Sequence, residues 1–82
     1  MKKTRQGQER NIIGKRVRSA RLKCKPAVSQ DDLAGKLAAT GVSLDQTAIS
    51  RIENGTRYVM DYEIDALAKA LKVTVASLFG EK

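Results

Sequence analysis

The segment from Ser29 to Gly55 constrains the fold of this chain more than any other, because it holds two short helical patterns separated by a turn. In each half, apolar residues recur three or four positions apart, which is the spacing of one face of an α-helix. These residues are Leu33, Ala34 and Leu37 in the first half, and Ile49 and Ile52 in the second. The sequence therefore predicts two consecutive amphipathic helices, the second with a polar face opposite its isoleucines.

The first of these helices has a clear start and a clear end in the sequence. Ser29 is a typical N-cap, and Asp32, three positions later, is a weak form of the partner that completes a capping box. Gly41 suits the left-handed residue that often terminates a helix. The helix is therefore predicted to begin just after Ser29 and to end before Gly41.

The start of the second helix allows two interpretations. Asp45 is the favoured N-cap, whereas Ser43 followed by Gln46 spells an alternative capping box. Gly55 is expected to terminate this helix. Either start leaves Ile49 and the polar residues beside it inside the helix.

Another amphipathic helix precedes this pair. Its apolar residues are spaced four, three and four positions apart, at Ile13, Val17, Ala20 and Cys24. Asn11 is the expected cap at its start, and Gly14 is expected to weaken its first turn. Pro26 disfavours helical geometry at Lys25, so this helix is predicted to end near Cys24. Cys24 is interpreted as a small core residue.

Two more helices are predicted after Gly55. The longer one covers about Asp61 to Leu71, and its apolar stripe consists of Ile64, Leu67, Ala68 and Leu71. Thr74 is the expected cap of a short last helix over 75–79. Leu78 and Phe79, on that last helix, are expected to close the core.

These patterns predict an all-α fold of five helices that forms one domain over residues 11–80. Residues 1–10 have no apolar residue beyond Met1 and predict a flexible basic arm. With one cysteine and no histidine among 82 residues, neither an internal disulfide nor a zinc site is expected, and no cofactor is implied. The apolar runs are too short to span a membrane and no signal peptide precedes the domain, so a cytoplasmic protein is expected.

The charge of the chain is unevenly distributed. The net charge is +7, and residues 1–25 hold ten Lys and Arg but one acid, whereas residues 26–82 hold six basic and eight acidic residues. Such a basic region favours binding to the phosphates of a nucleic acid, with a strong dependence on salt. The alternative interpretation is a solubilising tail next to a basic helix face.

The sequence resembles the Xre/Cro/phage-repressor family of helix-turn-helix proteins over about 12–80. The similarity is carried by four fragments in order: IGKRVRSAR, SQDDLAGKL, AISRIENG and ALAKALKVTVASLF. The resemblance implies a compact five-helix, lambda-repressor-like DNA-binding domain whose second and third helices form the helix-turn-helix. The segment AATGVSLD between those helices is longer than is usual in the family, and Ala38 stands where a turn glycine is common.

The resemblance also implies roles for particular residues. The positions that match base-contacting residues are Gln46, Thr47, Ser50 and Arg51. The positions that match, or lie near, contacts to the DNA backbone are Gln30, Asn54, Arg57, Lys15 and Arg16, and Gln30 also matches a residue that braces the recognition helix. Arg21 and Glu53 match a structural ion pair between the first and third helices.

The expected function is that of a sequence-specific transcriptional regulator, a repressor that binds a palindromic operator in double-stranded DNA as a homodimer. The candidate dimer surface is the last helix with Tyr58, Tyr62, Leu78 and Phe79, although simple closure of the core is the favoured explanation for the aromatic residues. The alternative function is a protein-interaction module with the same fold, such as an antitoxin or an anti-regulator. An enzyme is disfavoured because no catalytic constellation is visible, and RNA binding because few aromatic residues are present for stacking.

Overall fold

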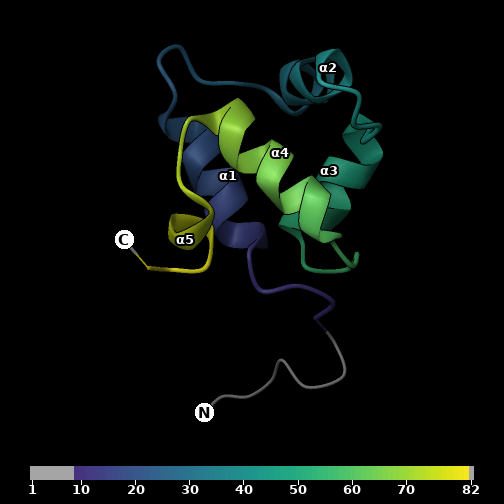
Figure 1. The fold of residues 1–82 in the computed structure, drawn as a ribbon, viewed down its shortest axis with the longest axis vertical. Helices are drawn as coiled ribbons and strands as arrows, with labels where there is room; N and C mark the ends of the chain where they lie inside the picture. The colour runs from purple at the N-terminus through teal and green to yellow at the C-terminus, as the bar shows by residue number, and fades with distance from the viewer. Residues whose placement is uncertain (1–8, 82) are drawn as a thin grey trace.

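The computed structural model describes residues 9–81, and these form five α-helices without a strand. In order they are α1 (Gly14–Lys23), α2 (Gln30–Ala39), α3 (Gln46–Glu53), α4 (Asp61–Leu71) and α5 (Val75–Leu78) (Figure 1). The predicted all-α fold is thus confirmed. The predicted flexible arm lies outside the described residues except for Glu9 and Arg10. Along residues 9–81, no helix combines the length and the apolar character needed to cross a membrane.

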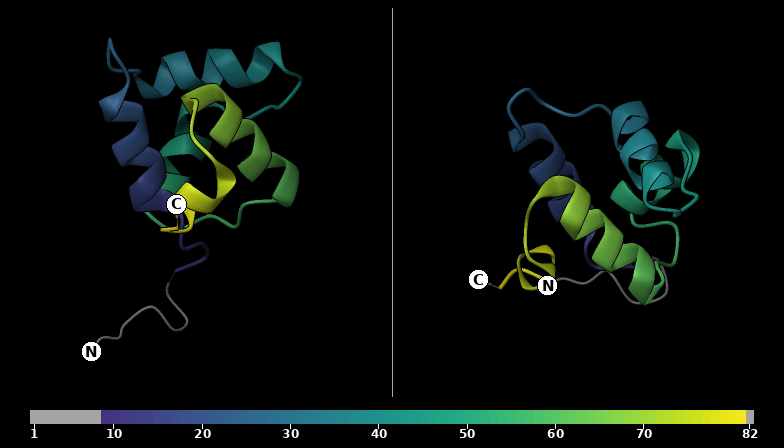
Figure 2. Two further views of the ribbon diagram at one scale, coloured as in Figure 1. Left: turned by 60° about the vertical axis from the view of Figure 1, so that its left-hand side comes forward. Right: turned by 45° about the horizontal axis from the view of Figure 1, so that its top comes forward.

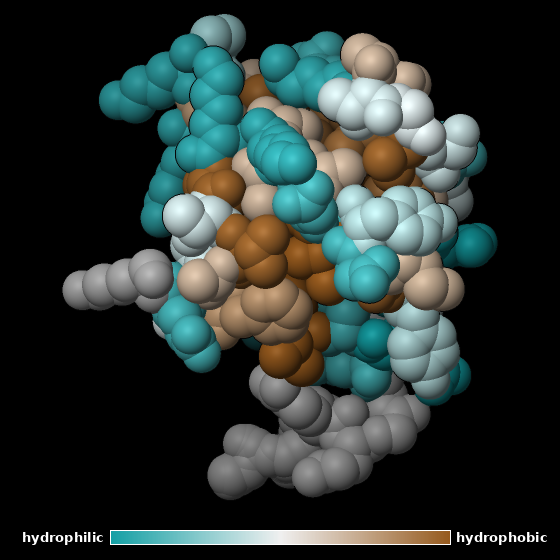
Figure 3. Space-filling view, in the orientation of Figure 1, coloured by the Kyte–Doolittle hydropathy of each residue, from teal (hydrophilic) through white to brown (hydrophobic). Residues whose placement is uncertain are grey.

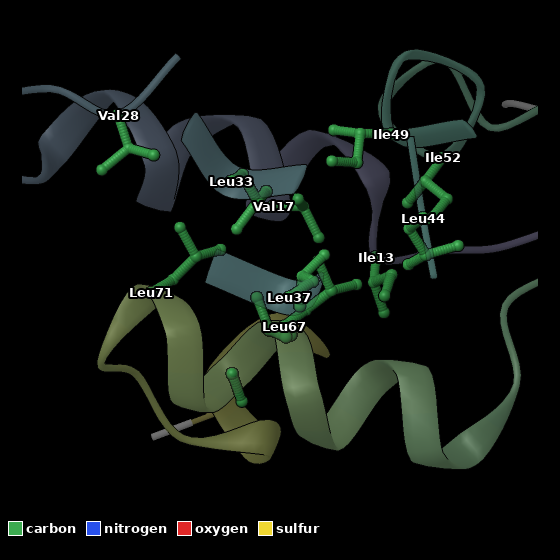
Figure 4. Packing of buried hydrophobic residues seen from close by; sticks show 12 residues of the cluster. Ile13, Val17, Val28, Leu33, Leu37, Leu44, Ile49, Ile52, Leu67 and Leu71 are labelled. Carbon is green, nitrogen blue, oxygen red and sulfur yellow. The ribbon is translucent and has the colours of Figure 1, made fainter. Parts of the chain in front are cut away.

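The helices enclose one core to which all five contribute. α2 crosses one end of α1 and α4 (Figure 2, left), α3 packs against both α1 and α2, and α5 covers α1 and α4. The core side chains converge between these helices (Figure 4), and they are Ile13, Val17, Val28, Leu33, Leu37, Leu44, Ile49, Ile52, Leu67, Ala68, Leu71 and Leu78. Full burial of each large aliphatic side chain contributes about 1.5 to 3 kcal/mol, so this cluster is the main source of stability.

The caps follow the local rules that the sequence suggests. Ser29 Oγ accepts a hydrogen bond from the Asp32 N–H at 2.9 Å, and the Asp32 carboxylate accepts one from the Ser29 N–H, which completes a capping box. Asp45 caps α3 by accepting from the Ala48 N–H at 2.8 Å, so Asp45 rather than Ser43 is the N-cap. Each cap satisfies an N–H that the helix itself leaves without a partner.

The last helix differs from the expectation in one respect. α5 ends at Leu78, which is 1% exposed, whereas Phe79 is its C-cap and is 39% exposed. The expectation that both residues close the core is therefore wrong for Phe79. A helix of a single turn presents one narrow face to the core, and Leu78 occupies it.

The junction of α1 and α3 is closer than the sequence suggests. A Cβ atom added to Gly14 would collide with the Ile52 carbonyl oxygen and would lie 2.9 Å from the Glu53 carbonyl oxygen. Gly14 is therefore the residue that allows α1 to approach the backbone of α3, and its role is not limited to weakening the first turn.

Asn11 secures the same junction with four hydrogen bonds. The N-cap of α1 is Ile13 and not the predicted Asn11, but Asn11 Oδ1 accepts from the N–H groups of Ile13 and Gly14 at 3.1 and 2.9 Å. Its Nδ2 donates to the carbonyl oxygens of Ile52 and Arg57 at 3.1 and 2.8 Å. The side chain thus joins the start of α1, the end of α3 and the loop that follows α3.

Candidate nucleic-acid interface

The residues predicted to contact bases lie together on the solvent-facing side of α3. We call Gln46, Thr47, Ser50 and Arg51 the outer face of α3. Three of them are exposed and Ser50 is half-buried. Ile49 and Ile52, on the opposite side, are fully buried, and this difference follows from the helical period of 3.6 residues.

Gln30, the first residue of α2, contacts both ends of α3. Its Oε1 accepts a hydrogen bond from Gln46 Nε2 at 2.8 Å, and its own Nε2 donates to Glu53 Oε1 at 3.1 Å. Gln46 is therefore held in one orientation at the N-terminal end of α3, while its side-chain oxygen is left to accept from a ligand. The arrangement also fixes the position of α3 relative to α2.

Arg21 and Glu53 form a bidentate ion pair between α1 and α3. Arg21 Nε and Nη2 donate to the two carboxylate oxygens of Glu53 at 2.8 and 3.0 Å, and Nη1 donates to the Val28 carbonyl oxygen at 2.9 Å. The two side chains are only 9% and 3% exposed. Hydrogen bonding to Glu53 raises the pKa of the Arg21 guanidinium and outweighs the effect of burial, which lowers it. The pair joins α1 to α3, and the hydrogen bond from Gln30 to Glu53 adds α2 to the same network.

Basic side chains of α1 lie next to this network. Lys15 and Arg18 line an open hollow of about 860 Å³ together with Gln30 and Asn54, which is the exposed C-cap of α3. The structure thus brings Lys15 to the same side of the molecule as two other residues predicted to contact the DNA backbone. Arg18 is an addition that the sequence did not single out, because its place relative to α3 depends on how α1 packs.

Arg16 lies between two regions of the surface. Its guanidinium is next to Gly80, where an added Cβ would lie 2.7 Å from Arg16 Nη2. Arg16 also lines a small hollow together with Lys15 and Asn54, near the C-terminal end of α3.

Arg57, predicted to contact phosphate, is already paired within the protein. Its Nη1 and Nη2 donate to the two carboxylate oxygens of Glu63 at 3.0 and 3.4 Å, and Nη1 also donates to the Tyr58 carbonyl oxygen. Burial of Glu63 alone would raise its pKa, but the hydrogen bonds from Arg57 and from the Met60 N–H hold that pKa below its ordinary value. Arg57 therefore serves to fix the loop between α3 and α4.

Sites for other chemistry are sparse in the described part of the chain. Within residues 9–81, no three His, Cys, Asp or Glu side chains gather in a way that would hold a metal ion. Cys24 is half-buried, and its thiol donates to the Ala20 carbonyl oxygen at 3.4 Å.

Comparison of the chain with protein-family models, with curated proteins and with solved structures gives no match in any of the three.

Proposed function

We propose that this protein is a sequence-specific regulator that binds double-stranded DNA. In this proposal α2, the turn and α3 form a helix-turn-helix, and α3 enters the major groove, whose width admits an α-helix. The observation that carries the proposal is the outer face of α3, which consists of four polar side chains. The hydrogen bonds of Gln30 to Gln46 and Glu53 fix this helix against α2, and the ion pair between Arg21 and Glu53 fixes it against α1.

The chemistry of the outer face suits recognition of base edges. A glutamine amide can form two hydrogen bonds with adenine, and a guanidinium can form two with guanine. Gln46 meets the first requirement with an orientation fixed by Gln30, and Arg51 is exposed one to two turns further along α3. Thr47 offers a methyl group to thymine. Each well-formed bidentate contact discriminates by about 1 to 3 kcal/mol against the wrong base.

The positions of the basic side chains near α3 agree with a duplex that lies across this helix. Lys15 and Arg18 on α1 line one hollow together with Gln30 and Asn54, and these four side chains would bind phosphates on that side of the groove. A contact with about six phosphates would lower the affinity on the order of a thousandfold between 50 and 200 mM salt.

The proposed regulator acts as a homodimer, a repressor on a palindromic operator, because one domain of this size contacts only a few base pairs. Two copies about 34 Å apart would contact successive turns of the major groove. Of the residues expected at the dimer surface, Leu78 belongs to the core, whereas Tyr58 and Tyr62 are 63% and 61% exposed. Val75 of α5 and Phe79, its C-cap, are also partly exposed, and apolar surface is visible over α4 and α5 in Figure 3.

That apolar surface also favours a second candidate function, a protein-interaction module such as an antitoxin or an anti-regulator. The two functions differ in their dependence on salt. Binding driven by apolar contact changes little with salt, whereas binding to DNA weakens steeply.

Selection of binding sequences from random duplexes with the purified protein tests the proposal. A recurrent operator, with half-sites one helical turn apart, is the expected result. Recovery of unrelated sequences, or no binding to duplex DNA at 50 mM salt, would contradict the proposal. The selection also supplies the operator for the variants below.

As a first pair of variants, Arg51→Ala should relax the preference at one base pair, whereas Asn54→Ala should weaken binding to all sequences alike. Lys36→Ala is the matched control, since Lys36 is exposed on α2 beside Leu71 and Lys72, away from the outer face of α3.

A further inference from the structure

Two arginines lie next to Tyr58, in the loop between α3 and α4, and they differ in their ion pairing. Arg57 has its guanidinium bound to the carboxylate of Glu63. Arg10 comes from the segment that precedes α1, and within residues 9–81 no acid forms an ion pair with it. Of the two arginines, Arg57 is thus paired with a carboxylate, whereas Arg10 has no such partner among the described residues.

Arg10 is held in place at three points. Its backbone N–H donates to the Gly55 carbonyl oxygen at 2.6 Å, which fixes the chain against the end of α3. Its guanidinium carbon lies 5.3 Å from the centre of the Tyr58 ring, and its Nη1 is 3.4 Å from the Tyr58 hydroxyl oxygen. In Figure 1 the purple segment before α1 passes below the loop that joins α3 to α4. A cation held over an aromatic ring loses less side-chain entropy when it binds a ligand.

We propose that Arg10 and Tyr58 together form a binding site for a phosphate of the DNA backbone, at the C-terminal end of α3. The guanidinium has five N–H donors, of which one contacts the Tyr58 hydroxyl, and the planar group suits a phosphate. The Tyr58 hydroxyl accepts from Arg10 and keeps its own hydrogen for a second bond to the same phosphate. Both side chains are exposed, and Asn54, a proposed backbone contact, directly precedes the residue that holds Arg10.

This inference rests on the proposed function, and it reassigns two residues. Tyr58 moves from the candidate dimer surface to the DNA interface, and the phosphate contact of the loop moves from Arg57 to Arg10. The competing explanation is that the contact between Arg10 and Tyr58 only holds the segment before α1 against the loop. Such a contact would contribute to folding stability but would leave the salt dependence of DNA binding unchanged.

The test measures the affinity for the selected operator and for a random duplex between 50 and 200 mM salt, by fluorescence anisotropy. Arg10→Ala removes one phosphate contact from each protomer. It is expected to weaken binding to both duplexes about tenfold for each bound protomer, as loss of a charge-assisted hydrogen bond does. It should also reduce the slope of log affinity against log salt by about 0.9 per protomer, which is about 1.8 for a dimer. Tyr58→Phe should lose part of this affinity, and Tyr58→Ala more. The Arg10→Ala/Tyr58→Ala double variant should lose less than the sum of the two single losses, because the two side chains act as one site.

The control variant Lys36→Ala removes one positive charge elsewhere, from the exposed side of α2. It should keep the wild-type affinity and salt slope, and circular dichroism verifies that each variant is folded. An unchanged slope in Arg10→Ala, with wild-type DNA binding intact, would overturn this inference alone. If the wild-type protein binds no duplex at all, the proposed function fails and this inference fails with it.

Discussion

The replacement of Gly14 by alanine tests the packing of α1 against α3. Alanine is the better helix former by up to about 1 kcal/mol, so a prediction from helix propensity alone is that Gly14→Ala stabilises the protein. The structure predicts the opposite. The new Cβ would collide with the Ile52 carbonyl oxygen and would lie 2.9 and 3.1 Å from the carbonyl oxygen and carbon of Glu53. These are backbone atoms of a packed helix, so they cannot move aside as a flexible side chain would.

The expected net loss is about 2 kcal/mol, within the usual range for overpacking of 1 to 3 kcal/mol. For a domain of this size such a loss lowers the Tm by about 8 to 16 °C. Urea unfolding followed by circular dichroism measures the change in free energy directly.

Gly35 provides a matched control. It lies within α2, it is exposed, and an added Cβ would meet no atom within 4 Å. Gly35→Ala should therefore stabilise the protein by about 0.5 to 1 kcal/mol, because alanine has the higher helix propensity. The two substitutions are chemically identical and should have opposite signs. If Gly14→Ala is as stable as the wild-type protein, the close approach of α1 to α3 is not present in solution.

Three further predictions concern the ion pairs. Glu53→Ala should cost about 3 to 5 kcal/mol, because it leaves the buried Arg21 guanidinium without its partner; an unchanged urea midpoint would contradict this. Because the pKa of Glu63 is lowered in the folded protein, its ionised form stabilises the fold at neutral pH. This contribution is lost as the pH falls through that pKa, and a series of urea titrations between pH 7 and pH 2 would detect the loss. Arg57→Ala should remove most of this acid-dependent loss, and a pH profile identical to that of the wild-type protein would refute the role of the Arg57–Glu63 pair.

The helices and their caps could be predicted from the sequence because they depend on residues close together in the chain. The bond from the Asp32 N–H to Ser29 Oγ, and that from the Ala48 N–H to Asp45 Oδ1, each join residues three positions apart. The buried faces likewise follow from apolar spacing within one helix. Phe79 is the exception, because sequence alone does not reveal which of two adjacent apolar residues a one-turn helix buries.

Features that depend on packing between distant segments could not be predicted from local patterns. Asn11 bonds to carbonyl groups 41 and 46 positions away, and the need for glycine at position 14 arises from the backbone of α3. The candidate site shows the same limit. The sequence identified Arg57 as a basic residue of the loop, but its pairing with Glu63 depends on how the loop meets α4. Only the assembled fold shows that Arg57 is paired with Glu63, whereas no acid within residues 9–81 forms an ion pair with Arg10.

Recognition of base pairs by the outer face of α3 is decided by the affinities of the wild-type protein and of Arg51→Ala for DNA. Both affinities are measured on the selected operator and on a set of duplexes with one base pair changed at each position. The wild-type protein should lose about 1 to 3 kcal/mol at the base pair that Arg51 contacts, and Arg51→Ala should lose the preference at that base pair while keeping it at the others. Equal losses by Arg51→Ala on every duplex would contradict the claim that α3 reads sequence.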